Sequence, residues 1–264
     1  VAWNWKAGGD IADVSGNFIK DGVAFTPTQG TIDATSISVN TTAKFSIVTY
    51  QADSSTDADT VAHALGTVPE FIMIKNRDNA NGWAVYHVGT ASDPETDKLR
   101  LDQNYATVDS ADFWNDTAPT TNLFTVHNDP GVNYATSGNE NFDYVAYCWT
   151  SVAGYSKCGS YIGNGSTDGT YIHLGFKPAF FMLKSSSATG NWMIYDNKRD
   201  PDNRVAQGLF PNLTSAESEQ TGGFVDFVSN GVKCKEDGSA MNGSGVTYIY
   251  MAFAEAPFKY STAR

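Results

Sequence analysis

Short apolar runs, separated by polar and glycine-rich stretches, recur along the whole chain. The runs "FSIVTY", "FIMIK", "WAVYH" and "DYVAYCW" are rich in β-branched and aromatic residues and are bounded by Gly, Asn, Asp and Pro. In "FIMIK", Phe71, Met73 and Lys75 fall on one face of a strand. Ile72 and Ile74 fall on the other face, so both faces are largely apolar. This pattern predicts an all-β fold whose central strands are covered on both sides, as in a β-sandwich.

Helical periodicity is weak everywhere. The two best candidates, "DSADFWND" from Asp109 and "PNLTSAESEQ" from Pro211, are interpreted as loops with at most one turn. The 24 glycines fit a fold with many turns.

An internal repeat organises the chain. "TVAHALGTVPEFIMIKNRDNANGWAVYH", which begins at Thr60, matches "TYIHLGFKPAFFMLKSSSATGNWMIYD", which begins at Thr170. Pro69 matches Pro178, and most of the other matched positions keep this offset of 109 (178 − 69). Ordered aromatic matches at one offset indicate two copies of one structural unit. We therefore expect two tandem β-sandwich-like repeats, at 45–155 and 156–264.

The first residues resemble the end of such a unit. "VAWNW" at the start of the chain aligns with "VAYCW" in the last strand of the first repeat. We therefore expect 1–44 to hold the end strand of a preceding unit and a Gly/Thr-rich connector with a short hairpin at "NFIKDGVAFT". On this interpretation Val1 is not a native translation start.

The net charge of the chain bears on which molecules it can bind. The formal net charge of −12 argues against nucleic acid, because binding to phosphates needs a basic surface. No apolar run approaches the roughly 18 to 20 residues that span a bilayer, so no membrane insertion is expected. Cys148, Cys158 and Cys234 lack zinc-site spacing, and we interpret them as buried or incidental thiols, with one disulfide as the alternative.

The sequence contains no established catalytic motif. It has neither an H-E-x-x-H nor a G-x-S-x-G pattern, and His63 and His173 are explained by the repeat. We therefore expect no enzyme activity, cofactor or metal. Two alternatives stay open: Ca²⁺ binding by the Asp-rich loops "DSSTDADT" and "NGSTDGT", and a glycan depolymerase that uses two carboxylates. The candidate carboxylates are Glu140, Asp143, Asp196, Asp226, Glu217 and Glu219.

Two matching loops are candidates for ligand recognition. "NRDNANGW" ends at Trp83 and "SSSATGNW" ends at Trp192. An exposed Trp beside Asn, Asp and Arg can stack on a sugar while the polar groups bind its hydroxyls. The other interpretation, which the repeat favours, is a core Trp that closes a hairpin.

Two further loops are particular to one repeat. "FWNDTAPTTN" contains Trp114 and Asn115, and "DNKRDPDNR" contains Arg199 and Arg204. Loops on a rigid β scaffold commonly carry binding residues, so both are candidates for receptor or subunit contacts.

Long motifs give a family resemblance. "HALGTVPEFIMIKNRD", "GSYIGNGSTDG", "GFKPAFFMLK" and "TYIYMAFAEAPFKY" resemble a domain of bacteriophage structural proteins, seen especially near the C-terminus of tail fibres of marine phages. That domain often follows a lectin-like sandwich that ends in a segment similar to "WNWKAGG". The chain departs from the usual pattern at "WTSVAGYSK" and in the acidic "ADSSTDADT" loop. The resemblance implies a location in the virion and supplies no catalytic residues.

The sequence thus predicts a virion structural protein that contacts other virion proteins. The favoured function is attachment to a host-surface receptor, for which a glycan is one candidate, as part of a tail fibre. The alternatives are a capsid decoration module and a glycan depolymerase. By analogy with other fibres we expect a homotrimer. Its apolar contact face would come from "TYIYMAFAEAPFKY", through Tyr248, Tyr250 and Phe258.

Overall fold

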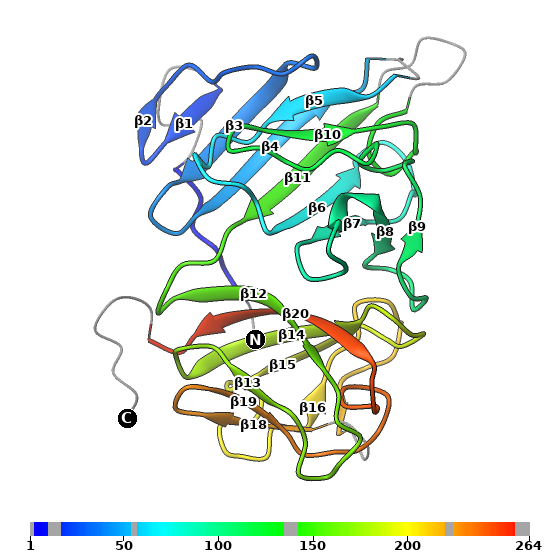
Figure 1. Ribbon diagram of the computed structural model, residues 1–264. Helices are drawn as coiled ribbons and strands as arrows, with labels where there is room; N and C mark the ends of the chain where they lie inside the picture. Colours follow the sequence, from blue (N-terminus) through cyan, green and yellow to red (C-terminus); the bar gives the residue numbers. More distant parts are fainter. Residues whose placement is uncertain (1–2, 10–16, 54–56, 135–141, 220–223, 257–264) are drawn as a thin grey trace.

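The computed structural model describes residues 3–9, 17–53, 57–134, 142–219 and 224–256, and they form an all-β protein (Figure 1). The single helical element of these ranges is the 3₁₀ turn η1 (Pro94–Thr96). The predicted loops at 109–116 and 211–219 contain no helix. None of the described helices could cross a lipid bilayer.

The first half of the chain forms a large sheet and a small one. The large sheet has the order β2-β1-β3-β4-β11-β6-β7-β8-β9, and the small sheet pairs β10 with β5. The strands are β1 (Phe18–Lys20), β2 (Val23–Ala24), β3 (Ala34–Asn40), β4 (Phe45–Gln51), β5 (Asp59–Ala62), β6 (Phe71–Asn76), β7 (Ala84–His87), β8 (Asp97–Arg100), β9 (Val108–Asp109), β10 (Leu123–Val126) and β11 (Asp143–Trp149).

The second half repeats this design with fewer strands. Its main sheet has the order β12-β20-β14-β15, and β13-β19-β18 form the sheet opposite. β16 and β17 make a separate short pair. The strands are β12 (Ser156–Ile162), β13 (Tyr171–His173), β14 (Pro178–Ser185), β15 (Met193–Asp196), β16 (Gln207–Gly208), β17 (Ser218–Glu219), β18 (Val225–Val228), β19 (Gly231–Cys234) and β20 (Thr247–Ala254).

The sequence repeat corresponds to a repeat in strand order. β4-β11-β6-β7 in the first half recurs as β12-β20-β14-β15 in the second. The central pairs keep the same register, because Tyr147 lies opposite Met73 and Met251 lies opposite Met182. We call the two halves unit 1 and unit 2.

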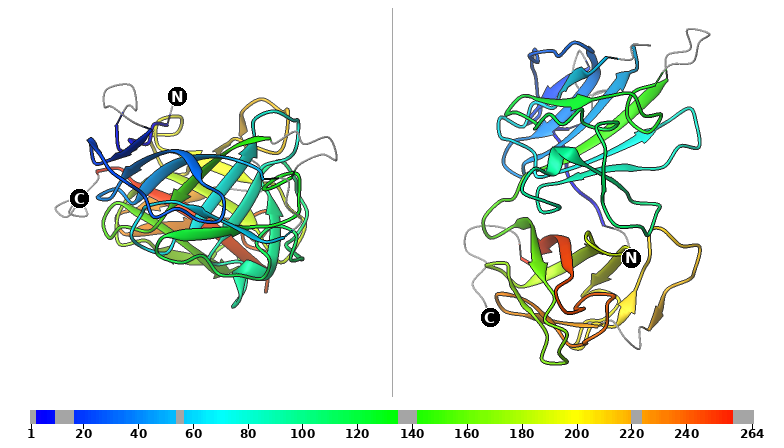
Figure 2. Two further views of the ribbon diagram at one scale, coloured as in Figure 1. Left: turned by 90° about the horizontal axis from the view of Figure 1, so that it is seen from above. Right: turned by 45° about the vertical axis from the view of Figure 1, so that its right-hand side comes forward.

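The two main sheets pack on each other, so the molecule has four layers (Figures 1 and 2). In β11, Ala146 and Cys148 point into the core of unit 1, whereas Tyr147 and Trp149 point toward unit 2. Twelve buried side chains from both units form one cluster at this junction. Because each buried Phe, Met or Leu side chain contributes about 1.5–3 kcal/mol, this apolar junction stabilises the contact between the two units. This arrangement explains why strands such as "FIMIK" are apolar on both faces: one face packs in the core of its own unit and the other packs on the second unit.

The segment 3–9 lies at the junction and forms no strand, so the expected end strand is not formed there. The ring of Trp5 is 6.1 Å from Trp149 of unit 1 and 5.8 Å from Phe180 of unit 2. Gly8 lies against the backbone of Val39, where a Cβ would come within 2.3 Å of the carbonyl oxygen. Because its ring contacts residues of both units, the indole of Trp5 packs between unit 1 and unit 2.

The connector expected before residue 45 is in part a strand. β3 pairs antiparallel with β4 along almost its whole length, and Ile37 and Val39 are buried in the core of unit 1. The predicted hairpin is present as β1 and β2. "TSISVN" alternates polar and apolar residues, which is the strand signal that the connector interpretation overlooked.

The apolar face proposed for trimer contacts is internal. Tyr248 and Tyr250 are buried in the core of unit 2, and Phe258 lies outside the described residues. The opposite face of β20 packs on unit 1 through Met251. Both faces of this strand are therefore used within one chain, and the prediction of an exposed face was wrong. All three cysteines are buried free thiols, as interpreted from the sequence.

Candidate functional site

Each unit carries an open pocket beside the same repeat loop. In unit 1, a pocket of about 740 Å³ lies against residues 78–81, which follow β6. In unit 2, a pocket of about 430 Å³ lies against residues 189–191, which follow β14. Pro130 lines the first pocket and Ser239, at the repeat offset, lines the second. We call these the unit 1 pocket and the unit 2 pocket.

The loop of the unit 1 pocket is shaped by the end of β6. The side-chain oxygen of Asn76 accepts hydrogen bonds from the backbone N–H groups of Asp78 and Asn79, both at 2.9 Å. The ammonium group of Lys75 donates to the carbonyl of Asn79 at 3.2 Å and also to that of Asn81. Asx turns of this kind fix loop backbones locally. The loop is thereby held in place before any ligand arrives.

The equivalent loop of unit 2 is held by different atoms. The hydroxyl of Ser185 accepts from the N–H of Ala188 at 3.1 Å and donates to its carbonyl at 2.9 Å. The backbone N–H of Gly190 donates to the carbonyl of Asn104 at 2.8 Å, and Asn104 belongs to unit 1. The loop of the unit 2 pocket is thus braced by the neighbouring unit.

Stacked tyrosines position the segment that contributes Pro130. Tyr50 and Tyr144 stack with ring centroids 5.2 Å apart. Their hydroxyls donate to the carbonyls of Val132, at 2.5 Å, and of Pro130, at 3.1 Å. Burial raises the pKa of both phenols, so they remain neutral donors at physiological pH.

Unit 2 repeats this tyrosine pair. Tyr161 and Tyr248 stack at 5.0 Å, and they donate to the carbonyls of Met241 and Ser239 at 2.6 and 2.7 Å. The same device therefore fixes one wall of both pockets.

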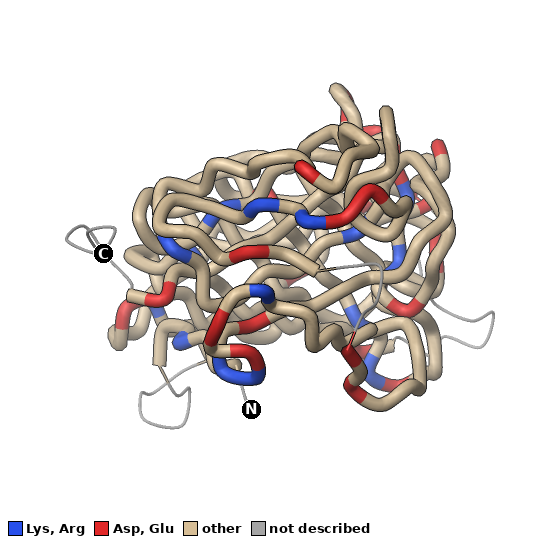
Figure 3. Tube along the Cα trace, turned by 90° about the horizontal axis from the view of Figure 1, so that it is seen from below, with Lys and Arg blue, Asp and Glu red and all other residues tan. Residues whose placement is uncertain are grey.

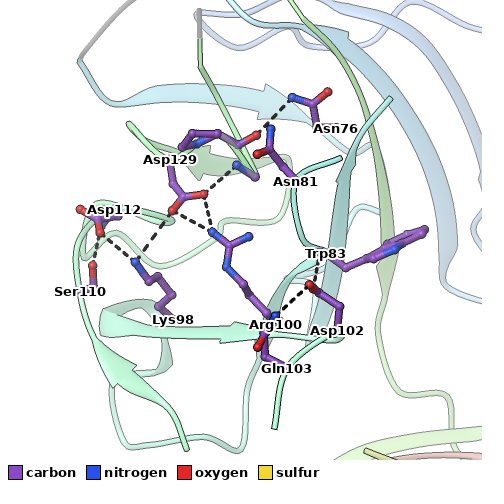
Figure 4. A network of polar contacts seen from close by, with 12 residues as sticks. Asn76, Asn81, Trp83, Lys98, Arg100, Asp102, Gln103, Ser110, Asp112 and Asp129 are labelled. Carbon is purple, nitrogen blue, oxygen red and sulfur yellow. Dashed lines mark hydrogen bonds and ion pairs between the residues drawn. The ribbon is translucent and has the colours of Figure 1, made fainter. Parts of the chain in front are cut away.

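A charged network supports the wall of the unit 1 pocket (Figure 4). One guanidinium nitrogen of Arg100 lies 2.8 and 3.0 Å from the two carboxylate oxygens of Asp129. The same carboxylate accepts the N–H of Gly131 at 2.7 Å. Lys98 lies 3.0 Å from Asp112 and 3.9 Å from Asp129. These cations are committed to carboxylates of the protein, so the network serves to position the Pro130 segment.

The linings of the two pockets differ in chemistry. The unit 1 pocket combines Asp78, Asn79 and Asn81 with the aromatic rings of Tyr134, which is 36% exposed, and Phe142. Of the described residues that line the two pockets, Asp78 contributes the one carboxylate, and it also accepts the N–H of Asp143 at 2.6 Å.

The unit 2 pocket combines hydroxyl and amide side chains with apolar ones. Thr189, Asn191 and Ser215 line it together with Phe210 and Leu213. Aromatic rings beside amide and hydroxyl groups are suited to sugars, whose C–H faces stack while their hydroxyls form hydrogen bonds.

Two tryptophans proposed as recognition residues are internal. For Trp114 the prediction was wrong, and for Trp192 the other interpretation, a core Trp, is confirmed. Trp114 is 2% exposed, and its indole N–H donates to the carbonyl of Asp97 at 3.1 Å. Trp192 is 1% exposed, and its indole N–H donates to the carbonyl of Arg100 at 2.9 Å. Their ring faces are covered by protein and cannot stack on a ligand.

Trp83 and Asn115 remain partly accessible. Trp83 is half-buried, and its ring stacks on Tyr147 with centroids 6.4 Å apart. Asn115 is half-buried in a turn with a positive φ of 49°. Neither residue lines the two pockets, so their part in recognition stays a prediction.

The two predicted arginines have separate environments. The side chain of Arg199 is 7% exposed and pairs with Asp196 at 2.6 Å and Glu217 at 3.1 Å, which makes it structural rather than receptor-facing. The side chain of Arg204 is 54% exposed, 3.5 Å from Glu219 and over the ring of Phe224. Arg204 therefore remains available at the surface.

The residues of the unit 1 pocket that sequence reasoning missed are Pro130, Tyr134 and Phe142. The repeat offset of 109 identified 76–83 and 185–192 as equivalent loops, which form one wall of each pocket. It could not identify the opposite wall, because that wall comes from more distant segments.

Comparison with known proteins places the chain in one family. Searches of the curated proteins and of the solved structures gave no match. One family model matches residues 1–257 and therefore includes both units. The chain belongs to the family described as a domain of unknown function (DUF7483).

Proposed function

We propose that this chain is a virion structural protein of a bacteriophage that attaches to glycans of the host surface through the unit 1 and unit 2 pockets. The observation that carries the attachment role is the repeated pocket itself. Each unit places a pre-formed loop beside an open pocket lined by aromatic or apolar and polar side chains. The virion location is supported by the resemblance of the long sequence motifs to phage fibre proteins.

The arrangement of charges supports a ligand without net charge. Lys98, Arg100 and Arg199 are paired with carboxylates, and along the described parts of the Cα trace in Figure 3 basic residues are interspersed with acidic ones. A dense polyanion such as nucleic acid would require a basic surface. Neutral sugars require shape, stacking and hydrogen bonds, which the two pockets provide.

The experiment is a binding screen of the purified chain against bacterial surface polysaccharides, with reducing ends measured in parallel. We expect saturable binding to at least one polysaccharide without release of reducing ends. Release of reducing ends would instead establish a depolymerase. Binding to none of them, with binding to empty capsids, would overturn attachment in favour of a decoration module. The mass of the chain in solution, which we expect to be that of a homotrimer, is measured on the same sample.

A further inference from the structure

An apolar crevice of about 160 Å³ lies at the junction of the two units. All of its lining side chains are aliphatic, aromatic or thioether groups. Those on which the argument rests are Met73 and Trp149 from unit 1, Phe180, Met182 and Met251 from unit 2, and Trp3 from the N-terminal segment.

The size of the crevice matches a single aromatic ring. An apolar cavity of about 150 Å³ in another protein stays dry and binds benzene or xenon, so a volume of this order suffices for such a ligand. Water would find no hydrogen-bonding partners among these side chains. An uncharged apolar molecule would gain contacts there that water cannot make.

The walls favour an aromatic guest over an aliphatic one. Trp3 meets Phe180 edge to face, with centroids 5.3 Å apart, so ring edges and faces border the space. The thioether sulfurs of methionine make favourable contacts with aromatic rings.

One wall can adapt to a guest. Trp3 and Trp5 are partly exposed and come from residues 3–9, which pair with no strand. Among the described residues, this segment accepts hydrogen bonds from the Asn40 side chain at Lys6 (3.1 Å), from the N–H of Gly22 at Gly8 and from the hydroxyl of Ser38 at Gly9. These indoles pack on Trp149, Phe180 and Phe253 through ring contacts, so a shift of the indoles would change the volume of the crevice and leave the strand pairing intact.

We propose that this crevice is a binding site for a small, uncharged, monocyclic aromatic molecule of the toluene class. The inference is independent of the proposed attachment function, because the crevice and the two loop pockets have no lining residue in common.

The five methionines provide the test. The whole chain, labelled with ¹³C in the methionine methyl groups, is titrated with toluene and followed by NMR. Met73, Met182 and Met251 line the crevice. Met193 and Met241 lie in the core of unit 2, where Met193 also lines the unit 2 pocket, so a shift of Met193 alone would report binding in that pocket rather than in the crevice. We expect saturable shifts of the first three signals and no shift of the other two. Unchanged signals, or equal shifts of all five, would overturn the proposal.

A variant whose crevice is filled by a larger side chain tests where toluene binds, and the same substitution at an exposed position is its control. Leu101→Trp adds volume at the crevice, and Val23→Trp adds the same side chain at a position that is 66% exposed. Toluene should leave the methionine signals of the Leu101 variant unchanged and shift those of the Val23 variant as in the parent chain. Ile194→Phe, a smaller addition to the lining, provides the same comparison with less strain. Parent-like shifts in the filled variants would contradict binding in the crevice.

Discussion

The indole N–H of Trp192, in unit 2, donates to the backbone carbonyl of Arg100, in unit 1, at 2.9 Å. Trp192 is fully buried at this position. Its repeat counterpart Trp83 is half-buried and stacks within its own unit, on Tyr147. One repeat position thus closes a loop in unit 1 and joins the units in unit 2.

Trp192→Ala should destabilise the chain by about 3–5 kcal/mol, because it leaves a large cavity at the junction and an unpaired carbonyl. Trp83→Ala is the matched control and should cost clearly less, since part of its ring already faces solvent. Urea unfolding followed by circular dichroism measures both. Equal losses would contradict the junction role of Trp192.

His87 should make the junction sensitive to acid. Its Nε2 lies 2.9 Å from the carbonyl of Tyr250 in unit 2, and its Nδ1 accepts the N–H of Gly89 at 2.9 Å. This arrangement uses the neutral ring, and burial lowers the pKa of His87 from 6.5 to about 4. Above pH 6.5 both folded and unfolded chains hold a neutral ring, so the contribution to stability is complete. As the pH falls from 6.5 to 4, the unfolded chain takes up the proton first and stability decreases, by on the order of 3 kcal/mol for this residue.

The comparison uses His87→Gln, which retains a donor and an acceptor but does not titrate in this range. Its stability should fall less steeply between pH 6.5 and 4 than that of the parent chain. Part of the slope should persist, because burial also lowers the pKa of His63 to about 4. Identical slopes for the two proteins would exclude His87 as a source of acid sensitivity.

Lys184 is a buried cation whose removal should stabilise the fold. Its side chain is fully buried, its ammonium group donates to the carbonyl of Ser185, and burial lowers its pKa to about 8. Between pH 8 and 10.5 the folded chain loses this proton before the unfolded chain does, so stability should rise with pH.

Lys184→Met should raise the free energy of unfolding at pH 7 by about 1–3 kcal/mol, because it removes the cost of burying the charge. Lys75→Met, at the equivalent position of unit 1, should instead lower it by about 1 kcal/mol through loss of the bonds to the pocket loop. Thermal and urea unfolding distinguish these opposite signs. Destabilisation by both variants would show that the buried ammonium of Lys184 is well compensated.

The tyrosine pairs should contribute equally in the two units. Tyr50→Phe and Tyr161→Phe each remove one hydroxyl and leave a buried carbonyl without its donor, which should cost about 1–3 kcal/mol. Tyr171→Phe, at an exposed position, should change stability by less than about 0.5 kcal/mol. Urea unfolding would refute the shared role if only one of the two buried variants lost stability.

Much of the fold could be predicted from the sequence. The offset between Pro69 and Pro178 indicated the repeat, and the alternation in "FIMIK" indicated strands covered on both faces. Such a pattern does not say what covers each face. Tyr248 and Tyr250 were therefore assigned to a subunit contact, although their own unit buries them and the other unit covers the reverse face of β20.

The candidate site could be predicted only in part. The equivalence of the loops 76–83 and 185–192 was visible, because local sequence determines such loops. The exposure of Trp114, Trp192 and Arg199 was not, because it depends on tertiary packing. Tyr134 and Phe142 could not be associated with Asn81, since strand pairing brings these distant segments together.

The most direct test of the attachment proposal is the affinity of pocket variants for a polysaccharide that the parent chain binds. Tyr134→Ala removes a partly exposed ring from the unit 1 pocket, Leu213→Ala alters the unit 2 pocket, and Tyr171→Ala alters an exposed tyrosine outside both. Calorimetric titration should show at least tenfold weaker binding for one or both pocket variants and unchanged binding for Tyr171→Ala. Parent-like affinity in both pocket variants would contradict recognition through these loops.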